Sequence, residues 1–329
     1  MTSTNVQRGI YVNSEAKTII RVARLYYDEG LNQQEIAAEM QLSRSTVSRM
    51  LERARKEGFV EIKVINPYDH DQDLARALQR RFNLKACVIT PTGVSERTSR
   101  RAIGLGVAGL LNEILKGGDV LGISWGATLY EMAINLNGVT PRGVQVVPLL
   151  GGMGQLPRHF QVNELANMIA QAFGGMAYAL HAPALVGSAD VKKALINDSS
   201  LSAEISLWSQ VTVAVVGIGP PISTSHMLST NYFGDSDVLT LMRQGAVGDI
   251  SARFFNESGC LCQAPVNERI IGVDLEMLRQ VPTVIGVAGG HEKVRSILGA
   301  LRGRWINILV TDISTAEELI RMAREDRTE

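Results

Sequence analysis

The sequence has few cysteines, few aromatic residues and no excess of charge of either sign. Its 329 residues include 3 cysteines and 5% aromatic residues, and its 33 basic residues are balanced by 33 acidic ones. This balance excludes the uniformly basic surface that binds nucleic acid regardless of sequence. Any contact with DNA must therefore come from a local patch.

Long apolar runs are also missing. The longest, VTVAVVGIG at 211–219, is interrupted by glycine and followed by two prolines, and it is far shorter than the roughly 18 residues that a membrane-spanning helix needs. The first residues, MTSTNVQRGIYVNSEAK, lack the apolar region of a signal peptide. We therefore expect a cytoplasmic protein that has no membrane partner.

The few cysteines point to a reducing compartment. Cys87, Cys260 and Cys262 form neither an even disulfide set nor a paired zinc motif. Cys260 and Cys262 could share one face of a strand and hold a metal, but no histidine lies close by in sequence, so packing is the favoured interpretation. We expect no metal site and no cofactor.

Residues 15–64 have the pattern of a small helical module. EAKTIIRVARLYYDE at 15–29 is apolar at helical spacing and is followed by Gly30, a common residue at a helix C-terminus. Asn32 can cap a second helix in which Glu35 stands three residues on, and Ser43 can cap a third.

The apolar spacing of the second and third helices is that of a helix-turn-helix. The inward positions are Ile36, Ala37, Met40, Leu42, Val47 and Met50. Gln41 departs from the pattern because it stands where glycine is commonest, which requires a left-handed backbone conformation at some cost.

The outward face of the third helix is rich in hydrogen-bond donors. Its first residues are suited to base edges in a major groove, whereas Gln33 and Arg53 are better placed for phosphates. The candidate DNA-binding residues are Gln33, Ser43, Arg44, Ser45, Thr46, Ser48, Arg49 and Arg53. The segment GFVEIKV at 58–64 is a candidate wing. The alternative is a three-helix bundle that serves packing or dimerisation.

The remainder of the chain predicts a second domain. We expect a disordered N-terminus at 1–14, a winged helix-turn-helix at 15–64, a linker at 65–73 and an α/β domain at 74–329. Short β-branched runs alternate there with amphipathic helical segments, which predicts parallel pairing and a doubly wound, mostly parallel sheet. The expected strands are ACVIT, DVLGIS, VQVVPLL, MAYALHA, VTVAVVGIG, TVIGVAGG and INILVTD.

Several of these strands end in glycine, at the edge of the sheet where ligands bind. Each such turn could equally be an ordinary βα turn, but four of them in one domain indicate a shared crevice lined by main-chain donors. GLGVAG at 104–109 matches a dinucleotide-binding string, but it lies inside a helical pattern and is discounted. The glycine-bearing segments are GISWGAT at 122–128, LLGGMG at 149–154, VGIGPP at 216–221 and GVAGGHEK at 286–293.

Polar residues near these turns are the candidates for hydroxyl and phosphate recognition. They include Ser124, Thr128, Lys293 and Asp249, the last of which is expected in a loop after Gly248. The alternatives are a helix-capping or turn-forming role for Asp249 and a solvated helix position for Lys293.

With these motifs, the sequence resembles the SorC family of bacterial transcriptional regulators over nearly its whole length. The resemblance rests on ARLYYDEGLNQQEIAAEMQLSRSTVSRML, GISWGAT, GIG, GAVGDI and GVAGG followed by Lys293. It implies a winged helix-turn-helix, a sugar-binding domain with a sugar-phosphate-isomerase-like fold, and a homodimer or homotetramer. The implied partners are double-stranded operator DNA and a sugar, polyol or sugar-phosphate effector.

The resemblance also implies effector-binding roles. The phosphate-binding turn corresponds to Ser124, Gly126, Ala127 and Thr128. With the other glycine turns, the candidate effector-binding residues are Ser124, Gly126, Ala127, Thr128, Gly151, Gly152, Gly217, Gly219, Asp249, Gly290 and Lys293.

The alternative to a regulator is a sugar-phosphate isomerase or deaminase with an accessory DNA-binding domain. Such an enzyme needs a general base and a general acid placed over the sugar. Asp249 could serve as the base, but none of the five histidines shows a convincing partnership with it. We therefore expect no catalytic residues and no enzyme activity.

Overall fold

The computed structural model describes residues 14–60, 69–136, 140, 142–154, 157, 160–225 and 233–325. The chain divides into two compact units, residues 1–67 and 68–329. The predicted N-terminal disorder at 1–14 lies outside the described residues up to position 13, and the predicted wing lies outside them from position 61. Helix α4 (Asp69–Phe82) begins inside the segment predicted as a linker, so the α/β unit starts earlier than position 74.

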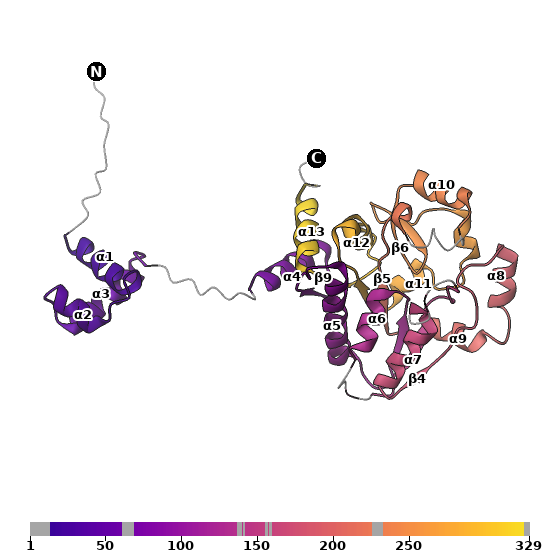
Figure 1. The fold of residues 1–329 in the computed structure, drawn as a ribbon, viewed down its shortest axis with the longest axis horizontal. Coiled ribbons are helices and arrows are strands. Elements are labelled where there is room, and N and C mark those ends of the chain that lie inside the picture. The colour runs from indigo at the N-terminus through magenta and orange to yellow at the C-terminus, as the bar shows by residue number, and fades with distance from the viewer. Residues whose placement is uncertain are drawn as a thin grey trace, which may run out of the picture. The chain divides into compact units, whose positions relative to one another are not determined.

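The first unit is a three-helix module, drawn in indigo in Figure 1. Its helices are α1 (Ser14–Tyr27), α2 (Gln33–Glu39) and α3 (Arg44–Lys56). They surround a small core of fully buried side chains that includes Ile19, Val22, Ile36, Val47 and Leu51. The predicted inward positions therefore form the core, as amphipathic spacing requires.

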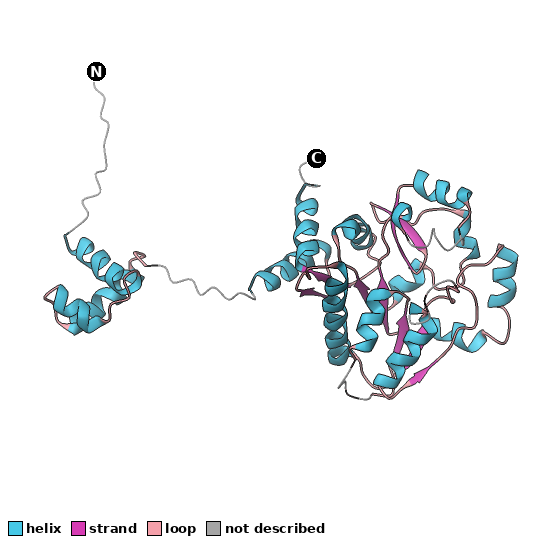
Figure 2. Ribbon diagram, viewed as in Figure 1, coloured by secondary structure: helices cyan, strands magenta, loops and turns pink. Residues whose placement is uncertain are grey.

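The second unit is built around a seven-stranded sheet with the order β1-β9-β8-β5-β2-β3-β4. Every pairing in this sheet is parallel, and the magenta strands are enclosed by cyan helices in Figure 2. The strands are β1 (Ala86–Thr90), β2 (Val120–Ile123), β3 (Gln145–Pro148), β4 (Met176–Ala177), β5 (Val213–Gly217), β8 (Thr283–Val287) and β9 (Ile308–Asp312). The doubly wound prediction is confirmed, although β4 is shorter than the segment expected for it.

Helices cover both faces of the sheet. Alternate residues of a strand point to opposite sides, and since both sets are apolar here, each face is buried under helices. Val213 and Val215 of β5 belong to one apolar core, and Ala214 and Val216 belong to a second. Helices α5, α6 and α7 contribute to the first core, and α4, α12 and α13 contribute to the second. Their bounds are α5 (Glu96–Ile114), α6 (Ala127–Ile134), α7 (Val162–Ala172), α12 (Val294–Arg302) and α13 (Ile313–Glu325).

The remaining elements complete the periphery of this unit. The helices are α8 (Ala189–Ile196), α9 (Ser202–Leu207), α10 (Asp235–Arg243) and α11 (Leu275–Gln280), with 3-10 turns η2 (Trp208–Gln210), η3 (Ile222–Thr224), η5 (Pro265–Arg269) and η6 (His291–Lys293). Strands β6 (Ala246–Ile250) and β7 (Arg253–Asn256) pair as an antiparallel hairpin apart from the main sheet. Sequence periodicity did not predict this hairpin.

Two further observations bear on what the chain can bind. No helix in the described part of the chain has the length and hydropathy that a membrane crossing requires. The described residues also contain no cluster of side chains that could hold a metal ion. Cys87 and Cys262 are buried and Cys260 is exposed, and all are free thiols.

Candidate functional site

The DNA-binding candidates lie around the turn between α2 and α3. The Asn32 side chain accepts hydrogen bonds from the main-chain N–H groups of Gln34 and Glu35, at 2.9 and 3.1 Å. The Glu35 carboxylate accepts one in return from Asn32 N–H at 2.8 Å. Gln41 adopts the predicted left-handed conformation, with φ 53°. These contacts fix the start of α2 and its connection to α3.

Helix α3 presents an exposed polar face. Ser43 caps it by accepting a hydrogen bond from Thr46 N–H at 3.1 Å, so the Ser43 hydroxyl is occupied at the helix end. The exposed side chains of the first turns belong to Arg44, Ser45, Ser48 and Arg49. They have the donors that contact base edges when a helix N-terminus enters a major groove.

Arg53 is engaged differently from the other arginines of α3. Its guanidinium lies 2.5 Å from the Glu15 carboxylate of α1 and 2.9 Å from that of Glu57. Arg44 and Arg49 form no ion pair within the described residues. Arg53 therefore joins α3 to α1, and the two exposed arginines are the stronger candidates for DNA contact.

The α/β unit contains a cavity of about 440 Å³, which we call the effector cavity after the predicted effector-binding residues that line it. It is lined by residues that follow β2, β5 and β8, at the carboxyl edge of the sheet where ligands of such folds bind. The predicted residues that line it are Ser124, Gly126, Ala127, Thr128, Gly217, Gly219, Asp249 and Lys293. Sequence segments far apart along the chain thus meet at one place.

The turn before α6 leaves the start of the helix without a side-chain cap. Gly126 has φ 133°, which only glycine adopts readily, and it begins α6 without a side-chain cap. The first N–H groups of a helix have no partner within the helix and carry a partial positive charge. In α6 they lie among the cavity-lining residues Ala127, Thr128 and Leu129, so a phosphate or a hydroxyl can occupy this end.

Asp249 lies on strand β6, not in the predicted loop, and its side chain is only 5% exposed. Gly219 packs so closely on it that an added Cβ would lie 1.9 Å from the Asp249 carboxylate. Burial raises the pKa of Asp249 to about 6, although the Ala252 N–H and the nearby Lys293 act in the opposite direction. The pKa of this carboxyl group is therefore well above that of an exposed aspartate.

Lys293 ends the short 3-10 turn η6 and lines the same cavity. It is part-buried and not a solvated helix residue. Burial lowers the pKa of Lys293, while Glu292, Asp249 and Glu96 raise it. The cavity thus holds an amine and several carboxylates near the uncapped end of α6.

Sequence reasoning missed several lining residues. Glu96 and Arg100 come from the start of α5 and lie 3.7 Å apart, and their spacing of four along a helix was the only available signal. Ser251 follows Asp249 in the hairpin, and its hydroxyl lies 3.2 Å from that of Ser124. The position of Ser251 depends on the hairpin β6–β7, which the sequence did not reveal.

Three predicted glycines do not line the effector cavity. Gly151 packs against the main chain of Ala182 and Pro183, and Gly152 forms a bridge with Pro183. These two serve close packing of main chains beside β3. Gly290 is the residue before η6, the turn that carries Lys293.

Comparisons with known proteins agree with this two-part arrangement. Residues 66–321 match the family model described as "Putative sugar-binding domain", and residues 15–57 match the model of Sigma-70, region 4. The deoxyribonucleoside regulator of Bacillus subtilis (strain 168) is 36% identical over 311 residues, which cover 92% of this chain and 96% of that protein.

A solved structure is similar over nearly the same length. The full-length sorbitol operon regulator SorC from Klebsiella pneumoniae is 32% identical, covers 94% of this chain and 99% of its own, and superposes with a TM-score of 0.73. The transcriptional regulator LsrR of Enterobacter sp. (strain 638) is 32% identical and covers 94% of both chains.

A helix-turn-helix module joined to an α/β sugar-binding domain defines a DNA-binding transcriptional regulator. This chain belongs to the SorC family of such regulators. The relatives are named as regulators, which does not favour the enzyme alternative.

Proposed function

We propose that the protein controls a bacterial carbohydrate-utilisation operon by binding a sugar monophosphate in the effector cavity. The observation that carries this proposal is the uncapped N-terminus of α6 in the same cavity as Asp249 and Lys293. Helix N-termini bind phosphate through free N–H groups. Carboxylates and amines at the other positions suit sugar hydroxyls and a carbonyl oxygen.

The DNA contact is proposed at α3, through Arg44, Ser45, Thr46, Ser48 and Arg49, with Gln33 on a phosphate. Operator DNA would be bound in the cytoplasm by a homodimer or homotetramer, as half-site recognition requires more than one copy of the module. Such a regulator has one conformation that binds the operator tightly and one that binds it weakly. The effector can shift the balance between them only as far as its own affinities for the two conformations differ.

A thermal-shift screen tests the effector class. The full chain is heated with sugars, polyols and their phosphates, and the Lys293→Ala variant is compared with Lys193→Ala, which removes an exposed lysine from α8. We expect one phosphorylated compound to raise the melting temperature more than its parent sugar, and Lys293→Ala alone to lose the effect.

Two other outcomes would contradict parts of the proposal. Stabilisation by a free sugar or polyol alone would reject the phosphate assignment and keep the regulator. Loss of the shift in both lysine variants would place the compound outside the effector cavity.

A further inference from the structure

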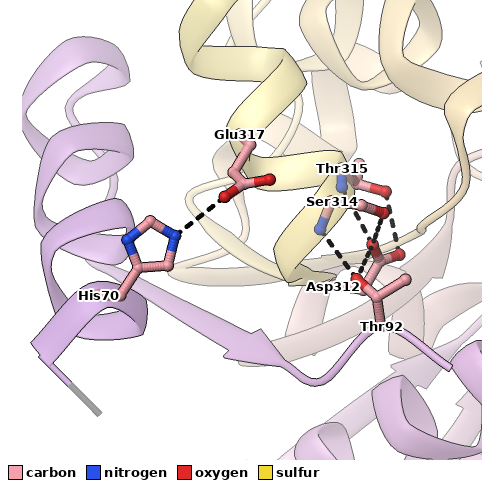
Figure 3. A network of polar contacts seen from close by, with 6 residues as sticks. All are labelled: His70, Thr92, Asp312, Ser314, Thr315 and Glu317. Carbon is pink, nitrogen blue, oxygen red and sulfur yellow. Dashed lines mark hydrogen bonds and ion pairs between the residues drawn. The ribbon is translucent and has the colours of Figure 1, made fainter. Parts of the chain in front are cut away.

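A buried carboxylate lies next to the effector cavity without lining it. Asp312 is the last residue of β9 and is 1% exposed. Its carboxylate accepts hydrogen bonds from the hydroxyls of Thr92 at 3.1 Å, Ser314 at 2.7 Å and Thr315 at 3.0 Å, and from Thr315 N–H at 3.0 Å. We call these four residues the Asp312 cluster, and Figure 3 shows them converging on the carboxylate.

The cluster fixes the direction of the Thr315 hydroxyl. Burial raises the pKa of Asp312, but the hydrogen bonds from Ser314, Thr315 and Thr92 outweigh burial and leave the pKa below its usual value. An ionised carboxylate only accepts hydrogen bonds. The Thr315 hydroxyl therefore donates its single hydrogen to Asp312, and its oxygen remains free to accept.

That oxygen accepts a hydrogen bond from Gly290 N–H at 2.8 Å. Gly290 has φ 108°, and an added Cβ on Gly289 would lie 2.2 Å from the Asp312 carboxylate. The two glycines thus lie directly against the cluster. Lys293 N–H in turn donates to Gly290 C=O at 3.0 Å, so the single turn that carries Lys293 starts from the residue that Thr315 holds.

We propose that Thr315 is a positioning residue for the effector, because it holds the Gly290 turn from which Lys293 extends into the effector cavity. Thr315 does not line that cavity, so its effect is exerted through Lys293. The inference rests on the proposed function for the role of Lys293 in binding.

The cluster also lies close to the helix that follows the DNA-binding unit in sequence. Glu317, two residues after Thr315 on α13, lies 3.0 Å from His70 of α4. Both side chains are exposed, and such pairs contribute little to stability. The part-buried hydrogen bond from Gly290 N–H to Thr315 is therefore the contact that the variants below remove.

The test measures Lys293 directly in the full chain without a ligand. Acetic anhydride acetylates only the neutral amine, so acetylation of each lysine peptide is followed by mass spectrometry from neutral to alkaline pH. The chain has eight lysines, and exposed Lys193 is the internal reference. We expect Thr315→Val to move the Lys293 titration toward that of Lys193, while Thr315→Ser retains the wild-type profile.

Ser314→Ala is the matched control, because the Ser314 hydroxyl donates to the other oxygen of the Asp312 carboxylate and makes no contact with Gly290 N–H, which bonds to Thr315. A wild-type Lys293 profile in Thr315→Val, or an equal change in Ser314→Ala, would overturn the proposal. If Thr315→Val does not fold, Thr315→Ala replaces it. Failure of both to fold would reject the proposal too, since Thr315 would then serve the stability of the whole domain.

A second measurement separates this inference from the proposed function. Sugar monophosphates of the thermal-shift panel are tested for protection of Lys293 from acetylation, with the parent sugars and inorganic phosphate as controls. We expect Thr315→Val to need about tenfold more compound, as the loss of one hydrogen bond implies. If no monophosphate protects wild-type Lys293, the proposed function fails, whereas the ligand-free titration still decides the role of Thr315.

Discussion

At the scale of single residues, Asp249 gives the α/β unit a dependence on pH. Its pKa is raised to about 6 by burial, above the usual value of about 3.9. When a carboxyl group binds its proton more tightly in the folded state than in the unfolded state, the free energy of unfolding falls as pH rises. The loss falls between about pH 4 and about pH 6 and amounts to roughly 2 to 3 kcal/mol.

The variant Asp249→Asn removes this titration. We expect it to become more stable relative to the wild type as pH rises through that window, and to keep a constant difference above it. Melting temperatures across the pH range check this expectation, with Asp190→Asn as an exposed control on α8. A difference that stays constant from acid to neutral pH would show that Asp249 does not titrate there.

Gln41 stores backbone strain in the turn between α2 and α3. It is exposed and adopts φ 53°, a conformation that costs a non-glycine residue about 1–2 kcal/mol. Gln41→Gly removes this cost but loses more entropy on folding, so we expect a net gain of about 0.5–1 kcal/mol.

Circular dichroism melting of the helical unit within the full chain checks the gain at Gln41. Gln41→Ala keeps the Cβ and the strain, so it should give no comparable stabilisation. Equal stability of the glycine and alanine variants would contradict the strain argument.

At the scale of elements, α3 is expected to carry operator recognition. Arg44→Ala or Arg49→Ala should weaken operator binding by roughly 1–3 kcal/mol if the arginine contacts a base. Arg53→Ala should weaken operator binding less, because Glu15 and Glu57 already engage the Arg53 guanidinium. These pairs are exposed, so the melting temperature of the module should change little.

Fluorescence anisotropy with operator DNA, selected from genomic fragments, checks the first effect at several salt concentrations. Unchanged binding by both Arg44→Ala and Arg49→Ala would show that α3 is not the recognition helix.

The elements differ in how well the sequence predicted them. Helices α1 to α3 were predicted because their caps, such as Asn32 and Ser43, and their apolar spacing are local signals. The strands of the main sheet were predicted because burial on both faces produces continuous β-branched runs. Hairpin β6–β7 was missed because its turn, Ser251–Ala252, lacks the Asn-Gly or Gly-Gly pairs that favour positive φ, although both residues adopt it.

The cavity was predicted only where its residues follow main-sheet strands. Ser124, Gly126 and Gly217 come directly after β2 or at the end of β5, so parallel topology brings them together. Arg100 enters from a helix face, and Thr315 contacts Gly290 from the first turn of α13. Such placements depend on tertiary packing, which spacing along one segment does not encode.

At the scale of the whole molecule, the two units have separate cores. Variants in one unit should therefore leave the intrinsic function of the other intact, as is usual for sites that share no packing partners. Linkage nevertheless requires reciprocity: the factor by which the effector changes operator affinity equals the factor by which operator DNA changes effector affinity.

The Lys293→Ala variant tests whether operator binding can be separated from its dependence on the effector. We expect its operator affinity without effector to stay within about twofold of the wild type, because Lys293 belongs to the α/β unit, while the effector no longer changes that affinity. Arg49→Ala should show the converse, with weak operator binding and a normal effector-dependent rise in melting temperature. Anisotropy and thermal-shift titrations of both variants check the pair, and loss of effector-free operator binding in Lys293→Ala would show that the cavity residue acts on DNA binding without any ligand.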